Sequence, residues 1–223
     1  MSDDSFIREV NEELRQDQAR ALWNRYGMIA IAVATVAILL TAAFVGWQYW
    51  NRTQANRSGD AFSQALTLAA QGRHDEAVAA LEELETGGHG AYPVLARLRT
   101  ATVLFQRGDA QAAVAVFDTV SSDRSIPESI RDMARLRSGL ILVDHGSYAD
   151  VSARVETLTA DTNTLRHSAR EALGLAAWKE GRLADALPFF EQIVADQSAP
   201  RNMRDRATLM SELIRGSGDS PET

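Results

Sequence analysis

Residues 27–50 read GMIAIAVATVAILLTAAFVGWQYW and contain no charged side chain. At about 1.5 Å per residue, this stretch forms a helix about 36 Å long, enough to cross a hydrocarbon core about 30 Å thick. Both ends carry amphipathic rings, which favour the headgroup region of a bilayer; they are Trp23, Tyr26, Trp47, Tyr49 and Trp50. The stretch therefore predicts a single transmembrane helix. The alternative, a buried core helix, is rarely this long and apolar on all sides.

The arginines on either side of this helix predict its orientation. Four precede it and only two follow it closely: Arg8, Arg15, Arg20 and Arg25, then Arg52 and Arg57. Basic residues accumulate on the cytoplasmic side of a span, whereas acidic ones contribute little. We expect residues 1–26 to form a cytoplasmic tail and the C-terminal domain to lie in the periplasm, with the helix crossing a bacterial inner (plasma) membrane. A cleaved signal peptide has an apolar core of only about 7–15 residues, so we expect an uncleaved signal anchor.

Two weaker patterns accompany the transmembrane helix. In the tail, Ile7, Val10 and Leu14 fall on one helical face, which predicts an amphipathic helix. It either docks on a partner or on the inner leaflet, or it merely leads into the membrane. Small residues also recur within the span, at Ala30, Ala34, Ala37 and Thr41. Such a stripe lets another transmembrane helix approach closely, although alanine is frequent enough in this sequence to produce one by chance.

A repeat begins after a juxtamembrane linker at residues 51–57. Its glycines are separated by 36, 38 and 35 residues: Gly72, Gly108, Gly146 and Gly181. Small side chains lie seven residues before and five after each glycine, at Ala65, Ala101, Gly139 and Gly174 and at Ala77, Ala113, Val151 and Ala186. Larger apolar ones lie nine and twelve after, at Leu81, Phe117, Val155 and Phe190 and at Leu84, Val120, Leu158 and Ile193. A period of about 34 residues around a glycine turn is typical of stacked helix–turn–helix units.

The repeat has a physical basis in helix packing. Small side chains let the two helices of a unit cross closely, and glycine adopts the turn geometry that ends the first helix. Pro127 and Pro200 each follow a repeat glycine by 19 residues, where proline suits the start of the next helix. A last helix over roughly 200–214 is expected to cap the stack. The prediction is an all-α fold in which a single N-terminal transmembrane helix precedes an α-solenoid. The solenoid comprises about four helix hairpins plus the capping helix at residues 58–215, and a flexible tail follows at 216–223.

These units resemble the tetratricopeptide repeat, with one departure. Its usual tryptophan near the start of the first helix is replaced by Ala61, Arg97, Arg135 and Arg170, so this face is expected to meet solvent or acidic groups. In tetratricopeptide-like stacks the first helices line a concave groove. The groove positions lie 10, 6 and 3 residues before each glycine. Their apolar members, our candidate partner-binding residues, are Phe62, Leu66, Leu98, Phe105, Leu136, Leu140, Val143, Leu175 and Trp178.

Two interpretations of these apolar positions remain open. In the first, the groove holds an apolar segment, either a partner helix or an unfolded stretch of an exported chain. In the second, the first helices are rotated so that the same side chains form the core between helices. The remaining positions among those 10, 6 and 3 residues before each glycine are occupied by Ala69, Thr102 and Glu171.

The sequence gives no sign of enzyme chemistry. His74, His89, His145 and His167 form no metal-ligand array. The run Gly87-Gly88-His89-Gly90 lacks the lysine and the preceding strand of a phosphate loop. No nucleophile stands beside a base, and the chain has no cysteine. The formal net charge of −7 disfavours nucleic acid as a partner. We expect a protein that is not an enzyme and has no cofactor or metal.

The exit of the apolar stretch, Gly46-Trp47-Gln48-Tyr49-Trp50-Asn51, together with the repeats, resembles the YfgM-like family of ancillary SecYEG translocon subunits. The start of the second unit, with Tyr92, Leu95, Ala96, Leu98 and Ala101, is similar as well. The resemblance implies an inner-membrane protein whose periplasmic repeats lie beside the translocon, together with a membrane-anchored periplasmic chaperone of the prolyl-isomerase type. Such a protein assists the handover of exported polypeptides. The resemblance also implies contact between the cytoplasmic tail and an envelope-stress regulator.

A rival interpretation assigns the repeats to a coordinator of envelope assembly or cell division. Related proteins of that kind usually carry a cleaved signal and a coiled-coil segment, and this chain shows neither pattern. A repeat surface is also compatible with a homodimer. A third interpretation, a membrane-anchored enzyme, needs a polar constellation that the sequence does not contain.

Overall fold

A computed structural model describes residues 3–217 of the chain, and within residues 3–30 the side chains only of Arg20 and of residues 22–29. Every regular element in this range is a helix, which confirms the all-α fold. The helices are α1 (Asp3–Ala70), α2 (His74–Gly87), α3 (Tyr92–Gln106), α4 (Ala110–Ser122), α5 (Glu128–His145), α6 (Tyr148–Val155), the 3-10 helix η1 (Glu156–Thr159), α7 (Arg166–Lys179), α8 (Leu183–Ala195) and α9 (Arg201–Gly216). The chain divides into two compact units at Gln54/Ala55.

The first unit is the N-terminal part of α1. Between residues 3 and 217, one helix is long and apolar enough to cross a membrane, and its most apolar window is exposed. The hydroxyls of Thr35 and Thr41 donate to the carbonyl oxygens of Ile31 and Ala37 at 2.9 and 2.8 Å. These bonds satisfy both groups within the helix, as an apolar solvent requires. The side chains of Ile7, Val10, Leu14 and Ala30 lie outside the described residues.

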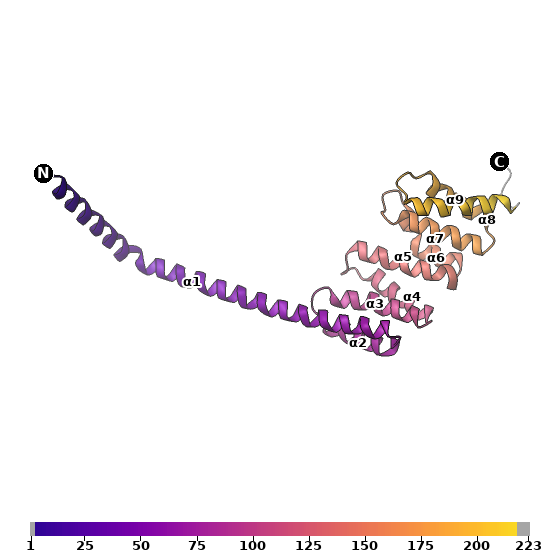
Figure 1. The fold of residues 1–223 in the computed structure, drawn as a ribbon, viewed down its shortest axis with the longest axis horizontal. Coiled ribbons are helices and arrows are strands. Elements are labelled where there is room, and N and C mark those ends of the chain that lie inside the picture. The colour runs from indigo at the N-terminus through magenta and orange to yellow at the C-terminus, as the bar shows by residue number, and fades with distance from the viewer. Residues whose placement is uncertain (1–2, 218–223) are drawn as a thin grey trace. The chain divides into compact units, whose positions relative to one another are not determined.

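The second unit is a stack of helix hairpins that begins inside α1 (Figure 1). The predicted linker at residues 51–57 is helical and continuous with α1. The hairpins are the end of α1 with α2, α3 with α4, α5 with α6 and η1, and α7 with α8, and α9 packs on α8 at the end of the stack. α9 ends at Gly216, so most of the predicted flexible tail lies outside the described residues.

Three of the four repeat glycines make the predicted left-handed turn. Gly72, Gly108 and Gly181 have φ angles of 77°, 93° and 73°. Gly146 is different, because it is extended and leads directly into Ser147, whose hydroxyl accepts a hydrogen bond from the Asp150 amide and closes a capping box. A Cβ atom here would lie 2.8 Å from Leu142 Cδ2 and 3.2 Å from the Leu142 carbonyl oxygen, so a larger residue would require the leucine side chain to shift.

The small residues seven positions before the turns mark the helix crossings. A Cβ atom on Gly139 would lie 2.4 Å from Val155 Cγ1, and one on Gly174 would lie 2.8 Å from the Phe190 ring. Val155 and Phe190 both stand nine residues after their turn glycine, so the same pair of repeat positions meets in both units. Ala65 and Ala101 are fully buried at the equivalent positions of the first two units.

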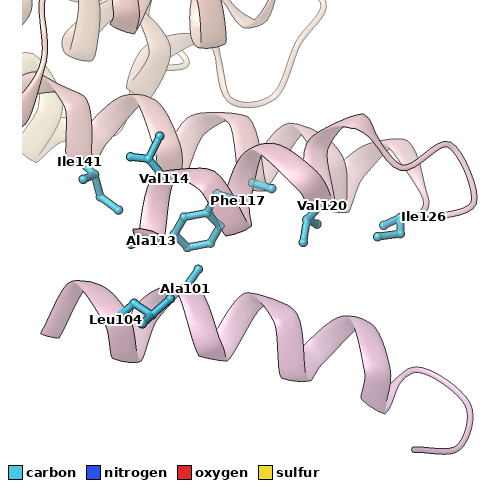
Figure 2. Close-up of a cluster of buried hydrophobic side chains, with 9 residues drawn as sticks. Ala101, Leu104, Ala113, Val114, Phe117, Val120, Ile126 and Ile141 are labelled. Atoms are coloured by element: carbon cyan, nitrogen blue, oxygen red, sulfur yellow. The ribbon is translucent and has the colours of Figure 1, made fainter. Parts of the chain in front are cut away.

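Four apolar clusters follow one another along the stack, and each joins helices of neighbouring units. Figure 2 shows the cluster formed by α3, α4 and α5, in which the Phe117 ring faces Ala101 and Leu104 of α3. Because every unit shares its core with the next, the solenoid is stabilised by interfaces between neighbours rather than by one central core.

Two connections between units repeat a motif. They read Asp123-Arg124-Ser125-Ile126-Pro127 and Asp196-Gln197-Ser198-Ala199-Pro200. Each aspartate accepts from the backbone N–H and the hydroxyl of its serine, at 3.0 and 2.6 Å in the first and 2.9 and 2.6 Å in the second. Each proline then precedes the first residue of a helix. The motif fixes the path from one hairpin to the next.

Candidate partner-binding groove

A groove runs between α3 and α5, which both pack against α4. It consists of two adjoining hollows of about 190 and 240 Å³ that share Thr102, Phe117 and Arg137 as lining residues. Its other lining residues are Phe62, Leu95, Leu98, Arg99, Phe105, Met133, Leu140 and Ile141. Phe117 also belongs to the core cluster formed by α3, α4 and α5. The floor of the groove is therefore the outer side of this packed cluster.

The structure brings together four of the nine candidate partner-binding residues. Phe62, Leu98, Phe105 and Leu140 line the groove. Phe105 and Leu140 remain 41% and 43% exposed, so both side chains are accessible to a partner. Phe105 also packs edge-on against His145, with ring centroids 6.0 Å apart.

The other five candidates lie elsewhere. Leu136 is only 8% exposed and belongs to the core between α5 and α7. Val143 and Leu175 are partly buried against core clusters, and Leu66 is half-buried. Trp178 is exposed but lines neither hollow of the groove. Each of the two interpretations of these positions therefore describes some of the side chains.

Sequence reasoning missed several lining residues. Leu95 and Met133 lie 13 residues before their repeat glycines, and Arg99 and Arg137 lie 9 before. The positions 10, 6 and 3 residues before each glycine lie on one face of the helix, and these four residues belong to the same face. Leu95 and Met133 extend that face by one more turn. The signal that could have found them is this same periodicity, extended toward the start of α3 and α5.

Acidic groups accompany the arginines that replace the usual repeat tryptophan. Arg97 donates to Glu85 at 2.8 Å and to Asp123 at 3.0 Å. Arg135 donates to Asp132 at 2.8 Å, and Arg170 is buried and donates to the Thr159 carbonyl at 2.9 Å and to Asp161. The serine hydroxyl and amide of the linker, followed by Arg97, hold the pKa of Asp123 below its usual range. The Arg97–Glu85 pair links α3 to α2 and the Arg170–Asp161 pair links α7 to the loop after η1, whereas Arg135 and Asp132 pair within α5.

The comparisons with known proteins match this architecture. The model of a tetratricopeptide repeat-like domain matches residues 20–208, and so includes both the apolar stretch and nearly all of the helix stack. The chain belongs to this family.

One relative of this tetratricopeptide repeat-like protein is the ancillary SecYEG translocon subunit of Escherichia coli (strain K12). It is 25% identical over 196 residues, which cover 82% of this chain and 94% of the relative. The alignment thus spans almost the whole of the relative. It confirms the resemblance to ancillary translocon subunits that the exit of the apolar stretch and the repeats predict.

A serine, a histidine and an aspartate also meet at the other end of the tetratricopeptide repeat-like stack. Ser198 Oγ and Asp196 Oδ2 lie 3.4 and 3.6 Å from His167 Nε2. Both partners face the same ring nitrogen, and the buried Nδ1 has no hydrogen-bond partner among the described residues. A catalytic triad needs the acid and the nucleophile on opposite nitrogens, so this cluster is a structural contact.

A polar hollow of about 490 Å³ lies between the start of α5 and the loop before α7, with Glu128, Asp132, Thr162 and Asn163 in its lining. Asp132 is already engaged by Arg135 and by the Asn163 amide, at 2.8 and 3.3 Å. Among the described side chains, no group of three histidine, cysteine, aspartate or glutamate residues could hold a metal ion.

Proposed function

We propose that this chain is a membrane-anchored periplasmic scaffold for protein–protein interactions that acts as an ancillary subunit of the Sec translocon. Its repeats would assist the handover of exported proteins together with a membrane-anchored periplasmic chaperone. The observation that supports this most strongly is the similarity to an ancillary translocon subunit over 94% of that protein's length. The family match, over residues 20–208, includes the apolar stretch that precedes the repeats.

The groove between α3 and α5 is the surface that we assign to partner binding. Solenoids of this kind bind through extended concave surfaces, and an exposed apolar patch bordered by polar residues is typical of a protein-interaction site. Phe105 and Leu140 supply the exposed apolar contacts, and Phe62 and Leu98 extend the same surface. We infer a role in binding rather than catalysis, since the cluster around His167 cannot act as a triad.

Site-specific photo-crosslinking in intact cells tests the proposal. A photoreactive phenylalanine analogue would replace Phe105 in the groove, or, as a matched control, the exposed Ala115 on α4, which lines neither hollow. We expect the probe at position 105 to capture a translocon subunit or a membrane-anchored chaperone, and the probe at position 115 to capture neither. Capture of cell-division or envelope-assembly proteins from position 105 would favour the rival function instead.

A further inference from the structure

We propose that the groove selects a polypeptide segment in which acidic side chains are flanked by large apolar ones, and that Arg99 and Arg137 recognise its carboxylates. This inference rests on the proposed function in one respect, the assignment of the groove to partner binding. It adds the chemical class of the segment that occupies the groove.

The two arginines occupy equivalent places in successive units. Each lies nine residues before a repeat glycine, Arg99 on α3 and Arg137 on α5. Both line the larger apolar hollow, and Arg137 lines the adjoining one as well. The Nε atom of Arg99 is buried and has no hydrogen-bond partner among the residues that the structure describes. Within residues 20–217, no acidic side chain is paired with either guanidinium.

Other arginines on the same two helices are paired. Arg97 and Arg135 stand two residues before Arg99 and Arg137, and their acidic partners are Glu85, Asp123 and Asp132. Residues two apart on a helix point in different directions. Among the described side chains, carboxylates are thus paired with Arg97 and Arg135 but not with Arg99 and Arg137, which line the groove. Arg131 on α5, which lines neither hollow, donates to the Ile126 carbonyl oxygen. The missing negative charge can come from a bound partner.

The surroundings strengthen such an interaction. Phe62, Leu98 and Met133 line the groove beside the arginines. A partner whose apolar side chains cover this surface excludes water around the guanidinium groups, and partly desolvated charge pairs are stronger than fully exposed ones. Because the whole chain has a net charge of −7, nonspecific attraction of acidic segments is weak, and the preference has to arise locally at these two side chains.

The shape of the groove favours a polypeptide over a small molecule or an acyl chain. Its two hollows, of about 190 and 240 Å³, lie side by side and are open to solvent, whereas a typical small-molecule site buries most of its ligand's surface. They adjoin along an open groove in which Phe105 and Leu140 are exposed, whereas an acyl chain needs enclosure. A chain that places one apolar side chain in each hollow and a carboxylate near each arginine satisfies all of these contacts.

Fluorescence anisotropy with matched peptides tests this inference. The full-length protein would be reconstituted in nanodiscs of neutral phosphatidylcholine and titrated against labelled 12-residue peptides with identical leucine and phenylalanine positions. The intervening polar positions would be glutamate, glutamine or lysine. We expect the glutamate peptide to bind about tenfold more tightly than the glutamine peptide, and the lysine peptide to bind most weakly. The preference should shrink with added salt.

The variants assign the effect to the groove. In the double variant Arg99→Gln/Arg137→Gln, the glutamate and glutamine peptides should bind equally, with the affinity of the glutamine peptide unchanged. The control Arg124→Gln removes an exposed arginine that lines neither hollow, and it should retain the preference. Circular dichroism would establish that each variant is folded.

Equal binding of all three peptides to the wild type, or a preference that survives the double substitution, would overturn the inference. Displacement of the glutamate peptide by phosphatidylglycerol vesicles or oleate at lower concentrations than unlabelled peptide would overturn it in favour of a lipid. Photo-crosslinking from position 105 is independent of this outcome. If the probe captures translocon subunits but the peptides show no charge preference, the proposed function stands and this inference fails. If the peptides show the charge preference but the probe captures no translocon subunit or chaperone, this inference stands and the proposed function loses its support.

Discussion

Glycine stands at two of the helix crossings because the opposing side chains leave no room for a Cβ atom. Val155 is fully buried and opposes Gly139, and Phe190 opposes Gly174. The crossings of the first two units use buried alanines, Ala65 and Ala101, at the same repeat position. The tight contact is thus a property of the repeat position, which is occupied by alanine in two units and by glycine in the other two.

We predict that Gly139→Ala lowers the free energy of unfolding by about 1–3 kcal/mol, because the added methyl overlaps Val155 and overpacks the crossing. Gly87→Ala is the matched control, since no described heavy atom lies within 4 Å of its Cβ position. It should leave stability unchanged or raise it by up to about 1 kcal/mol. Urea unfolding of the full chain in mild detergent, followed by circular dichroism, measures both. A Gly139→Ala protein as stable as the wild type would contradict the crossing geometry.

His167 predicts a dependence of stability on pH. Burial first, and then the positive charge of Arg166, lower the pKa of His167 in the folded protein. The unfolded chain, in which the pKa is about 6.5, therefore binds the proton more readily. The stability contributed by neutral His167 is complete above about pH 6.5 and is lost as the pH falls below it. Asp196 adds nothing in this range, because its serine partner Ser198 and then Arg166 hold its pKa far below the usual value.

Denaturant unfolding at about pH 7.5 and about pH 5.5 measures this effect. The wild type should be less stable at the lower pH, and His167→Gln, which cannot be protonated, should lose less stability between the two. An equal loss in both proteins would show that His167 does not titrate as its surroundings imply.

At the scale of elements, the chain's single lysine ties α7, the first helix of the fourth hairpin, to α5, the first helix of the third. Lys179, at the end of α7, donates to the carbonyl oxygens of Val143 and Asp144 at 2.9 and 2.6 Å. Carbonyl groups in the last turn of a helix lack partners within it, so the ammonium group satisfies the end of α5 while joining two units.

We predict that Lys179→Met lowers the free energy of unfolding by about 0.5–1.5 kcal/mol, because both carbonyl groups lose a charged donor. Arg201→Met is the control, since this exposed arginine pairs with the exposed Asp205 at 4.0 Å, the limit for an ion pair. It should change stability by less than about 0.5 kcal/mol. Equal effects of the two substitutions in thermal unfolding would show that the lysine does not link α5 to α7.

Two leucines one turn apart on α5 have different roles, one in the groove and one in the core, and substitutions of them distinguish these roles. Leu140 is largely accessible and Leu136 is buried. Leu136→Asp should cost more than about 3 kcal/mol, because it buries a charge among apolar side chains. Leu140→Asp should change stability by less than about 1 kcal/mol yet abolish crosslinking from position 105. If Leu140→Asp unfolds the protein, or leaves partner capture unchanged, the groove assignment is wrong.

The helices and most turns could be predicted from the repeat, but the groove only in part. Spacing identifies the buried positions because close packing tolerates few residue types there, as at Ala77 and Leu81, both fully buried. Spacing does not give the rotation of each first helix about its axis, which decides that Leu136 faces the core while Leu140 faces out. The regular spacing of the repeat glycines predicts a left-handed turn at Gly146 as well, but this residue is extended. The spacing could not show this, because the turn after α5 depends on the capping box formed by Ser147.

At the scale of the whole molecule, the described residues combine an apolar helical stretch with a solenoid whose units share their cores. The family match, over residues 20–208, includes this combination. A surface held near a membrane binds its partners at a high effective concentration, so a groove of modest affinity is sufficient for transient capture. The predicted orientation determines which partners that surface can meet.

The proposed function depends on the repeats lying on the exported side of the membrane. Protease added to intact spheroplasts that express the chain with a C-terminal epitope tag tests it directly, with a cytoplasmic protein as the control for lysis. We expect the tag and the solenoid to be degraded while the cytoplasmic control stays intact. A tag that is protected until detergent opens the membrane would place the solenoid in the cytoplasm and contradict the proposed function.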